Sequence, residues 1–292
     1  MRKRLTLSLL VAAAFGVLAL VVPEAAGATG SPGPPYYLSL GDSLAQGVQP
    51  TSSGQSVITD QGYADDLYSV ERLQVPGLKL EKLGCPGEST TTMITTTVCD
   101  GAYAPFANQL AAAVAFLATH RVALITIDIG ANNVDDCLTP TGISLQCIGA
   151  GFAAAESDLP KILGALRAAA PGVPIVGMNY YDPFLAEWLQ GAAGQALAAQ
   201  SLAVTLAYNG VLGAIYAGAS VPVADVQSAF QTTVTSTIPI LQIPVNVAAI
   251  CTLTWMCAPA PVGPNIHARA LGYWVIASAF AEKVGRQGGG RP

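Results

Sequence analysis

Short apolar segments alternate with amphipathic or alanine-rich segments along this chain, and that alternation limits the possible folds more than any other feature. The clearest apolar segment is Val122 to Ile129, which is rich in β-branched residues and ends at Gly130. Strands that are apolar on both faces and alternate with helices indicate a parallel sheet covered on both sides. We therefore expect one α/β domain, a three-layer α/β/α sandwich around a mainly parallel five-stranded sheet. The predicted strands are 36–40, 78–83, 122–129, 173–178 and 221–224, and the predicted helices are 61–70, 108–120, 152–170, 185–216 (one long or two shorter) and 268–283.

The N-terminus has the layout of a secretory signal peptide. Three basic residues at 2–4 precede an apolar run from Leu5 to Val22, and Ala26-Gly27-Ala28 offers a cleavage site. The alternative is a membrane anchor, because the apolar run is long. We expect cleavage after Ala28 and a secreted, extracellular protein. The predicted organisation is a signal peptide at 1–28, a Pro/Gly linker at 29–35, a domain at 36–286 and a flexible tail at 287–292.

Composition excludes some partners. Only 11% of the 292 residues are charged, 52% are apolar, and the net charge is −5. Nucleic-acid binding needs a basic surface, so we expect no nucleic-acid partner. So low a charge density indicates an apolar cavity or an interfacial surface. The alanine-rich stretch 192–219 contains Gln195, Gln200 and Asn209 and is interpreted as a soluble helix, so we expect a monomer without a stable membrane span after signal cleavage.

Six cysteines occur as three close pairs. An even number in an exported chain indicates disulfides, although sequence alone leaves the connectivity open. Pairing between neighbours is the simplest hypothesis: Cys85–Cys99, Cys137–Cys147 and Cys251–Cys257. The rival is a metal site, but the chain has no C-x-x-C and only two histidines, so we expect neither a metal nor another cofactor.

Several polar or glycine residues follow the predicted strands. They are Ser43, Gly87, Asn132 and Asp182. In a parallel sheet the loops after the strands gather at one edge, where ligands bind. Ser43 lies one loop after the first strand at a predicted helix start, where outward-pointing N–H groups favour an anion.

A serine nucleophile needs a base, and the chain offers only two histidines. His120 ends a predicted helix just before a buried strand and is interpreted as structural. His267 precedes the last helix and is the candidate base. Taken alone, a histidine near a helix start is more often a surface residue.

Four short motifs then resemble the GDSL or SGNH hydrolases. Gly41-Asp42-Ser43-Leu44 resembles block I, and Gly84 to Thr90 resembles block II. Gly130-Ala131-Asn132-Asn133 resembles block III, and Asn265-Ile266-His267 with Gly272-Tyr273 resembles block V. Their order and spread cover nearly the whole domain. The resemblance implies a flavodoxin-like SGNH fold, Ser43 as nucleophile, His267 as base, and an oxyanion hole made by Ser43, Gly87 and Asn132.

Two positions depart from the family pattern. Block III usually ends in Asp and here ends in Asn133, which we expect to alter loop hydrogen bonding more than the reaction. Block V usually has Asp three residues before the histidine, where this chain has Pro264. We therefore predict a Ser-His pair oriented by the Pro264 carbonyl or a neighbouring one. The alternative is a carboxylate from elsewhere, Asp182 first and Asp135 or Asp136 after it.

Two further acidic residues are given structural roles. Asp42 can accept hydrogen bonds from backbone N–H groups in the loop around Ser43. Asp128 lies inside an apolar strand and is interpreted as a paired polar group of the core.

The apolar stretches 185–219 and 238–250 lie where relatives build substrate walls, and 238–245 has the prolines of a lid-like loop; core burial is the alternative. A hydrophobic wall favours a carboxylesterase or lipase that acts on small-molecule or lipid acyl esters, rather than a polysaccharide deacetylase. Two other classes stay open: an acyltransferase that uses the same acyl-enzyme, and a non-catalytic lipid- or glycan-binding protein.

Overall fold

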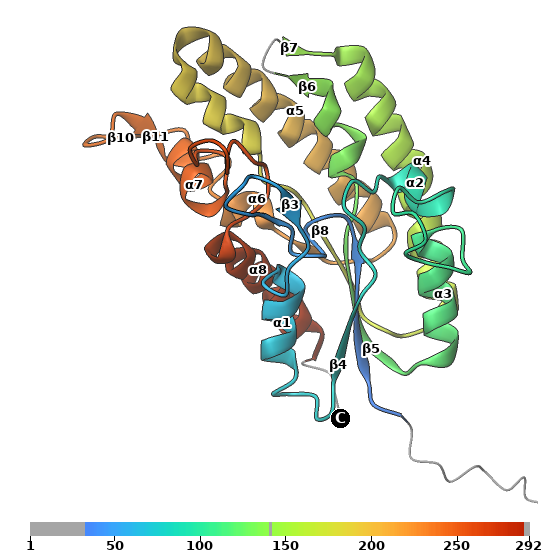
Figure 1. Ribbon diagram of the computed structural model, residues 1–292. Helices are drawn as coiled ribbons and strands as arrows, with labels where there is room; N and C mark the ends of the chain where they lie inside the picture. The colour runs from blue at the N-terminus through green and yellow to red at the C-terminus, as the bar shows by residue number, and fades with distance from the viewer. Residues whose placement is uncertain (1–32, 140–141, 289–292) are drawn as a thin grey trace, which may run out of the picture. The chain divides into compact units, whose positions relative to one another are not determined.

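The central feature of the fold is a parallel five-stranded sheet (Figure 1). The computed structural model describes residues 33–139 and 142–288, so the predicted signal peptide, most of the linker and the last residues of the tail lie outside the described part. All neighbouring strands of this sheet are parallel, in the order β4-β1-β5-β8-β9. The strands are β1 (Tyr36–Gly41), β4 (Lys79–Lys82), β5 (Val122–Asp128), β8 (Ile175–Met178) and β9 (Val223–Ala224).

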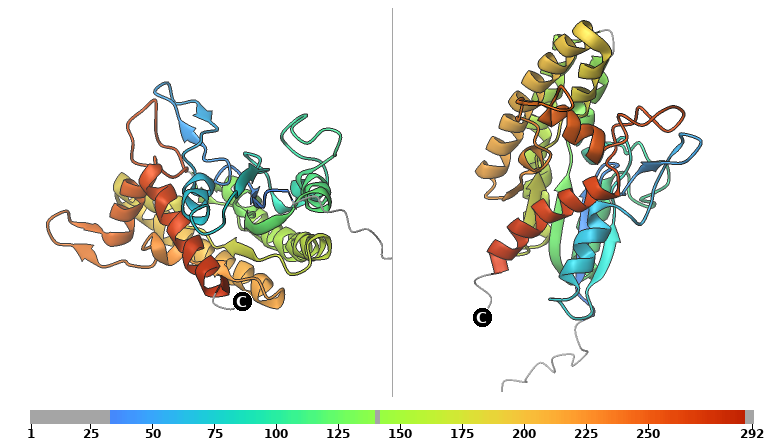
Figure 2. Two further views of the ribbon diagram at one scale, coloured as in Figure 1. Left: turned by 90° about the horizontal axis from the view of Figure 1, so that it is seen from below. Right: turned by 90° about the vertical axis from the view of Figure 1, so that its left-hand side faces the viewer.

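Helices cover both faces of the sheet, which confirms the predicted three-layer sandwich. On one face α1 (Tyr63–Glu71) packs against α8 (Ala270–Gly288). On the other, α4 (Leu145–Ala169) packs between α3 (Gln109–Thr119) and α5 (Gly191–Gly218) (Figure 2). The sheet is buried because its strands are apolar on both faces, and the central strands are almost wholly inaccessible to water.

Most predicted elements are present, with shifted ends. Helix α4 begins at Leu145 rather than at residue 152, because the Ser144 side chain accepts a hydrogen bond from the Cys147 N–H and caps it earlier. The segment predicted as one long or two shorter helices is two, a 3-10 helix η3 (Pro183–Gln190) followed by α5, and they meet at Gly191 with φ +79°. Helix α8 runs to Gly288, past the predicted domain end at 286.

The remaining elements are short and lie outside the central sheet. They are β2 (Gln49–Pro50), β3 (Ser56–Val57), α2 (Thr90–Ile94), η1 (Ala131–Asn133), η2 (Asp135–Cys137), β6 (Leu138–Thr139), β7 (Gly142–Ile143), α6 (Val226–Ala229), β10 (Thr237–Ile238), β11 (Ile243–Pro244) and α7 (Val245–Leu253). The lid-like stretch 238–245 is thus the hairpin β10–β11 and the start of α7. The hairpin projects from the body with Ile240 93% exposed at its tip, and none of its residues lines the pocket described below.

The three predicted disulfides are all present: Cys85–Cys99, Cys137–Cys147 and Cys251–Cys257. Among the described residues no cluster of three or more histidine, cysteine or acidic side chains could hold a metal ion.

One helical stretch, Pro183–Gly218, is long and apolar enough by length and composition to cross a membrane. In this fold it is tied to the sheet by polar contacts. The Tyr208 hydroxyl donates to the Gly130 carbonyl at 2.8 Å, and the Asn209 side chain bonds both the N–H and the C=O of Tyr180. It therefore packs as part of the helical layer over the sheet.

Candidate active site

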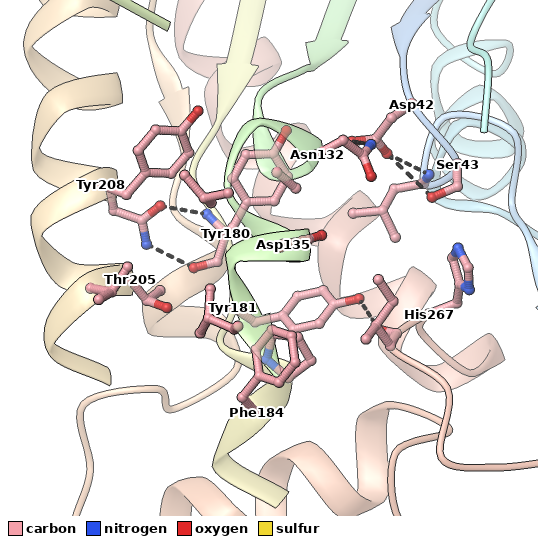
Figure 3. A pocket seen from close by; sticks show the side chains of 18 residues that line it. Asp42, Ser43, Asn132, Asp135, Tyr180, Tyr181, Phe184, Thr205, Tyr208 and His267 are labelled. Carbon is pink, nitrogen blue, oxygen red and sulfur yellow. Dashed lines mark hydrogen bonds between the residues drawn. The ribbon is translucent and has the colours of Figure 1, made fainter. Parts of the chain in front are cut away.

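Loops at the carboxyl ends of the strands, together with residues of α5, line a pocket that opens to solvent. Ser43 follows β1, Asn132 lies in η1 after β5, and His267 precedes α8. These three residues line one side of the pocket, and an aromatic wall faces them (Figure 3). The apolar lining residues are Leu44, Ala131, Val134, Leu138, Phe184, Val204 and Ile266.

The loop around Ser43 is held by two buried carboxyl groups. Asp42 Oδ1 accepts the Leu44 N–H at 2.9 Å, and Asp128 Oδ2 accepts the Ala45 N–H at 3.0 Å. The Asp42 N–H donates to the Asp128 carbonyl. The Ser43 N–H, by contrast, has no acceptor among the described residues, so it is free to bind an anion at the pocket.

Asp42 and Asp128 therefore have the structural roles expected for them. Asp128 Oδ1 also accepts the Tyr63 hydroxyl at 2.7 Å. Burial raises the pKa of Asp128 well above its usual range, and the adjacent Asp42 raises it further. Both effects disfavour the ionised form of Asp128, because two like charges would otherwise lie side by side in the core. Gly41 (φ +135°) is required here, because a Cβ at this position would collide with Asp128.

Asn132 is anchored with its amide beside Ser43. Its Nδ2 donates to the Glu88 carbonyl at 2.9 Å and makes a longer contact of 3.4 Å with Asp42 Oδ2. The shorter bond fixes the side chain, and the longer one can be exchanged for a ligand oxygen. The neighbouring Asn133 bonds Thr90 through both its oxygen (3.0 Å to the N–H) and its nitrogen (2.7 Å to Oγ1), so it ties this loop to α2.

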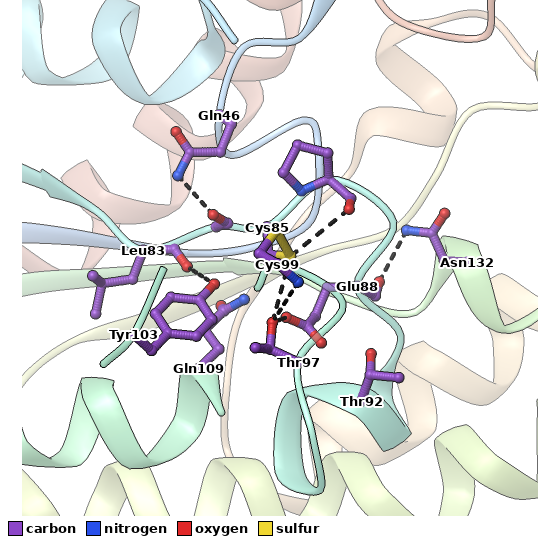
Figure 4. Close-up of a disulfide and its surroundings, with 12 residues drawn as sticks. Gln46, Leu83, Cys85, Glu88, Thr92, Thr97, Cys99, Tyr103, Gln109 and Asn132 are labelled. Atoms are coloured by element: carbon purple, nitrogen blue, oxygen red, sulfur yellow. Dashed lines mark hydrogen bonds between the residues drawn. A yellow bond between two sulfur atoms is a disulfide. The ribbon is translucent and has the colours of Figure 1, made fainter. Parts of the chain in front are cut away.

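Gly87 lies next to this arrangement but does not line the pocket. It has φ +85°, a conformation that favours glycine, and its N–H has no acceptor among the described residues. The turn that carries it is fixed by the Cys85–Cys99 disulfide and by Glu88, whose Oε2 accepts the Thr97 hydroxyl at 2.8 Å (Figure 4). Asn132 holds the same turn from the other side through the Glu88 carbonyl.

His267 is oriented by a side chain that the sequence analysis did not single out. Its Nδ1 lies 2.7 Å from Asn265 Oδ1, and the same oxygen accepts the His267 N–H at 3.0 Å. A backbone N–H can only donate, so the atom facing it is the amide oxygen. Asn265 Nδ2 in turn donates to Ser56 Oγ at 3.1 Å. Nδ1 therefore carries the proton, and Nε2 is left as the basic nitrogen.

This geometry corrects the expected orienting groups. The place predicted for the Pro264 carbonyl is taken by the neighbouring Asn265 amide. Asp182 is buried elsewhere: its Oδ1 accepts the Phe184 N–H at 2.9 Å at the start of η3, and its Oδ2 accepts the Ser201 hydroxyl at 2.8 Å. Both oxygens are engaged, so Asp182 does not orient the imidazole. Asp136 is exposed and does not line the pocket, whereas Asp135 does line it.

Ser43 and His267, the expected nucleophile and base, line the same pocket without a direct hydrogen bond between them. Burial lowers the pKa of His267 to about 4, so the imidazole is neutral at neutral pH, as a base must be. Catalytic hydrogen bonds are often formed fully only when substrate is bound. His120 ends α3, where its ring stacks on Phe116, and it does not line the pocket.

Residues 39–238 match the GDSL-like lipase/acylhydrolase family. The chain belongs to this family. The match includes Ser43, Gly87 and Asn132 and ends before His267. Family membership makes the protein a carboxylic-ester hydrolase, and the pocket shows where such chemistry has room.

Solved structures of this GDSL-family type share the fold at low identity. The extracellular lipase of Streptomyces rimosus is 20% identical with a TM-score of 0.53, covering 84% of this chain and 99% of that one. Phospholipase A1 of Streptomyces albidoflavus is 18% identical (TM-score 0.53, covering 86% and 99%). An acetylxylan esterase of Geobacillus stearothermophilus is 15% identical (TM-score 0.52, covering 87% and 95%). No curated protein sequence matches.

Proposed function

We propose that the protein is a secreted serine esterase or lipase that transfers the acyl group of an ester first to Ser43 and then to water. The observation that carries this proposal is the convergence of Ser43, Asn132 and His267 on one apolar-walled pocket. Attack by Ser43 Oγ on the ester carbonyl forms a tetrahedral intermediate while His267 Nε2 takes the hydroxyl proton. The imidazolium then gives that proton to the leaving alcohol, and water repeats the sequence to release the acid.

The negative charge on the carbonyl oxygen meets an oxyanion hole of three donors. They are the free N–H groups of Ser43 and Gly87 and the Asn132 amide. Fixed donors that need no reorganisation during the reaction are the largest single contribution in many such sites. The anchored turn and the Glu88-bound Asn132 supply that rigidity.

Asn265 orients the imidazole of His267, the proposed base. Its oxygen holds the Nδ1 proton of His267 and fixes the ring in the tautomer that leaves Nε2 free. An amide orients the ring as a carboxylate would, but it adds no negative charge beside the imidazolium. Burial lowers the pKa of His267, and no charge on residue 265 opposes this effect.

Three disulfides and the N-terminal sequence pattern support secretion. The apolar lining of the pocket supports a hydrophobic acyl group of a small ester or a lipid.

A chain-length series of p-nitrophenyl esters tests the function. The wild type hydrolyses them, whereas Ser43→Ala and His267→Ala lose activity and Asp182→Asn retains it. A fluorophosphonate labels wild type and not Ser43→Ala. Equal rates for wild type and Ser43→Ala would contradict the proposal, and failure to label would favour a binding protein. Acyl transfer to added alcohol in preference to water would make the protein a transferase.

A further inference from the structure

The pocket contains a carboxyl group that ester hydrolysis does not use. Asp135 begins η2, two residues before the disulfide-bonded Cys137. Figure 3 shows its carboxyl directed into the pocket, between the side that carries Ser43 and His267 and the wall that carries Tyr208. Within the described residues the Asp135 side chain makes no hydrogen bond and no ion pair, and only its main-chain carbonyl has a partner, the Leu138 N–H.

A carboxyl group without a hydrogen-bond partner is energetically unfavourable among apolar side chains. Its chain neighbour Val134 and the nearby Leu138 are buried, and an apolar side chain at 135 would complete the same lining. Asp135 is partly buried, and a polar side chain among the apolar residues of a pocket is the kind of group that fixes the orientation of a ligand. The catalytic groups leave it no role, because His267 Nδ1 is bonded to Asn265 and the loop of Ser43 is held by Asp42 and Asp128.

The charges around Asp135 decide which ligand it can take. The groups that act on it are Asp42, Asp136 and Asp182, all acidic. Burial, and then these neighbours, raise the pKa of Asp135 to about 8, so the group is a neutral carboxylic acid at neutral pH. A neutral carboxylic acid donates one hydrogen bond and accepts another, which suits a hydroxyl group. A cationic ligand would require the ionised form that this environment disfavours.

We propose that Asp135 binds a hydroxyl group on the acyl chain of the substrate, so that the enzyme prefers hydroxyacyl esters to plain acyl esters of the same length. This rests on the proposed function, because it deepens the specificity of that same site. We assign the hydroxyl to the acyl part because the acyl group stays covalently bound to Ser43, which lines the same pocket as Asp135, whereas the alcohol leaves.

The test compares p-nitrophenyl hexanoate with its 2-, 3- and 6-hydroxy derivatives, so that the alcohol is constant. In the wild type we expect at least one hydroxyhexanoate to have the higher kcat/KM, by about five- to tenfold, as for one neutral hydrogen bond. Asp135→Leu should abolish or reverse that preference mainly through KM. Asp135→Asn, which still donates and accepts, should retain most of it. The matched control is Asp136→Leu, an exposed neighbour outside the pocket, which should leave the ratio unchanged.

A binding measurement separates this proposal from the proposed function. Methyl esters of the same acids are titrated into Ser43→Ala and into Ser43→Ala/Asp135→Leu, with folding checked by thermal melting. Tighter binding of the hydroxy ester that depends on Asp135 supports the proposal even if turnover is absent. Equal ratios for wild type and Asp135→Leu at every hydroxyl position overturn it, as does a preference for an amino-substituted ester that rises with pH.

Discussion

Asn265 gives the catalytic base a neutral partner, and this choice has a measurable consequence for pH. His267 must be neutral to accept the Ser43 proton, and burial already lowers its pKa to about 4. The Asn265 amide orients the ring without stabilising the imidazolium by charge. Activity should therefore persist in mildly acidic solution, and kcat/KM should fall only as the pH approaches about 4.

Asn265→Asp should shift this acidic limit upward. A carboxylate at hydrogen-bond distance from Nδ1 favours the charged imidazolium and raises its pKa by about 1–3 units. The histidine then gains its proton at higher pH as the solution is acidified, so activity is lost earlier. The measurement is kcat/KM from pH 3 to 8. Asn265→Ala is the control. Its kcat should fall because the imidazole of His267 is no longer held, but the pH at which activity is lost should not rise. An unchanged limit in Asn265→Asp would show that residue 265 does not act on the imidazole.

Asn132 and Asn133 are adjacent amides with different expected effects. Asn132 faces Ser43 and is proposed to bind the oxyanion, so Asn132→Ala should lower kcat by about 10²–10³ with little change in KM. Asn133 ties its loop to Thr90, so Asn133→Ala should lower the thermal midpoint more than kcat. Steady-state kinetics and melting curves of both variants distinguish the roles. Similar losses of kcat in the two would contradict the assignment.

At this scale, chain order and the scarcity of histidines limited the choices that the sequence left open. Ser43 has a single matching motif, and two histidines left one candidate base. The orienting group was predicted wrongly because spacing alone pointed to Pro264. The Asn265 oxygen reaches both the His267 N–H and Nδ1 only through the local turn of the chain, and that turn is not readable from residue types.

At the scale of elements, one side chain fastens α5 to the edge of the sheet. The Asn209 oxygen accepts the Tyr180 N–H at 2.9 Å, and its Nδ2 donates to the Tyr180 carbonyl at 2.8 Å and to Gln227 Oε1 at 2.9 Å. The segment after β8 therefore obtains its hydrogen bonds from a helix instead of a neighbouring strand. The same segment supplies Tyr180 and Tyr181 to the pocket wall.

Asn209→Ala should lower the free energy of unfolding by about 2–4 kcal/mol, because it leaves buried N–H and C=O groups of Tyr180 without partners. Urea unfolding measures this loss. Gln200→Ala is the matched control, since Gln200 is exposed on the same helix and its removal should change stability by less than about 0.5 kcal/mol. Equal stability of the two variants would contradict a fastening role for Asn209.

The strands were predicted more accurately than the helices for a physical reason. A strand buried on both faces must be apolar throughout, so β5 is visible as a continuous apolar run ended by Gly130. The alanine-rich 185–216 segment has no such mark. Its break at Gly191 depends on a positive φ, and the earlier start of α4 depends on a cap at Ser144, so both boundaries were missed.

At the scale of the whole molecule, several carboxyl groups have a raised pKa in the folded protein. Burial raises the pKa of Asp182 to about 7 and that of Asp135 to about 8, and it raises that of Asp128 well above its usual range. In the unfolded chain such groups titrate near 3.8. The folded protein therefore binds more protons than the unfolded chain across the range between these values.

This excess of bound protons fixes the sign of the dependence of stability on pH. Stability contributed by a raised pKa is fully present below the unfolded value and is lost as the pH rises through the folded value. His267 opposes this between about pH 6.5 and 4, because its folded pKa is lowered. The net expectation is that the free energy of unfolding falls by about 2–4 kcal/mol between pH 5 and 8, allowing for solvent screening.

Urea unfolding at half-unit steps from pH 5 to 8 tests this expectation. Asp135→Asn should flatten the decline, because an amide reproduces the neutral acid and removes its titration. Asp100→Asn, at an exposed residue that is not among the groups acting on Asp135, should leave the slope as it is in the wild type. Stability that rises from pH 5 to 8 would mean that these carboxyl groups are ionised in the folded protein. If stability instead declines as the pH rises, and His267 stays neutral down to about pH 4, the protein is suited to acidic surroundings. The raised pKa values of the carboxyl groups then favour stability at low pH, and the uncharged partner of His267 preserves activity there.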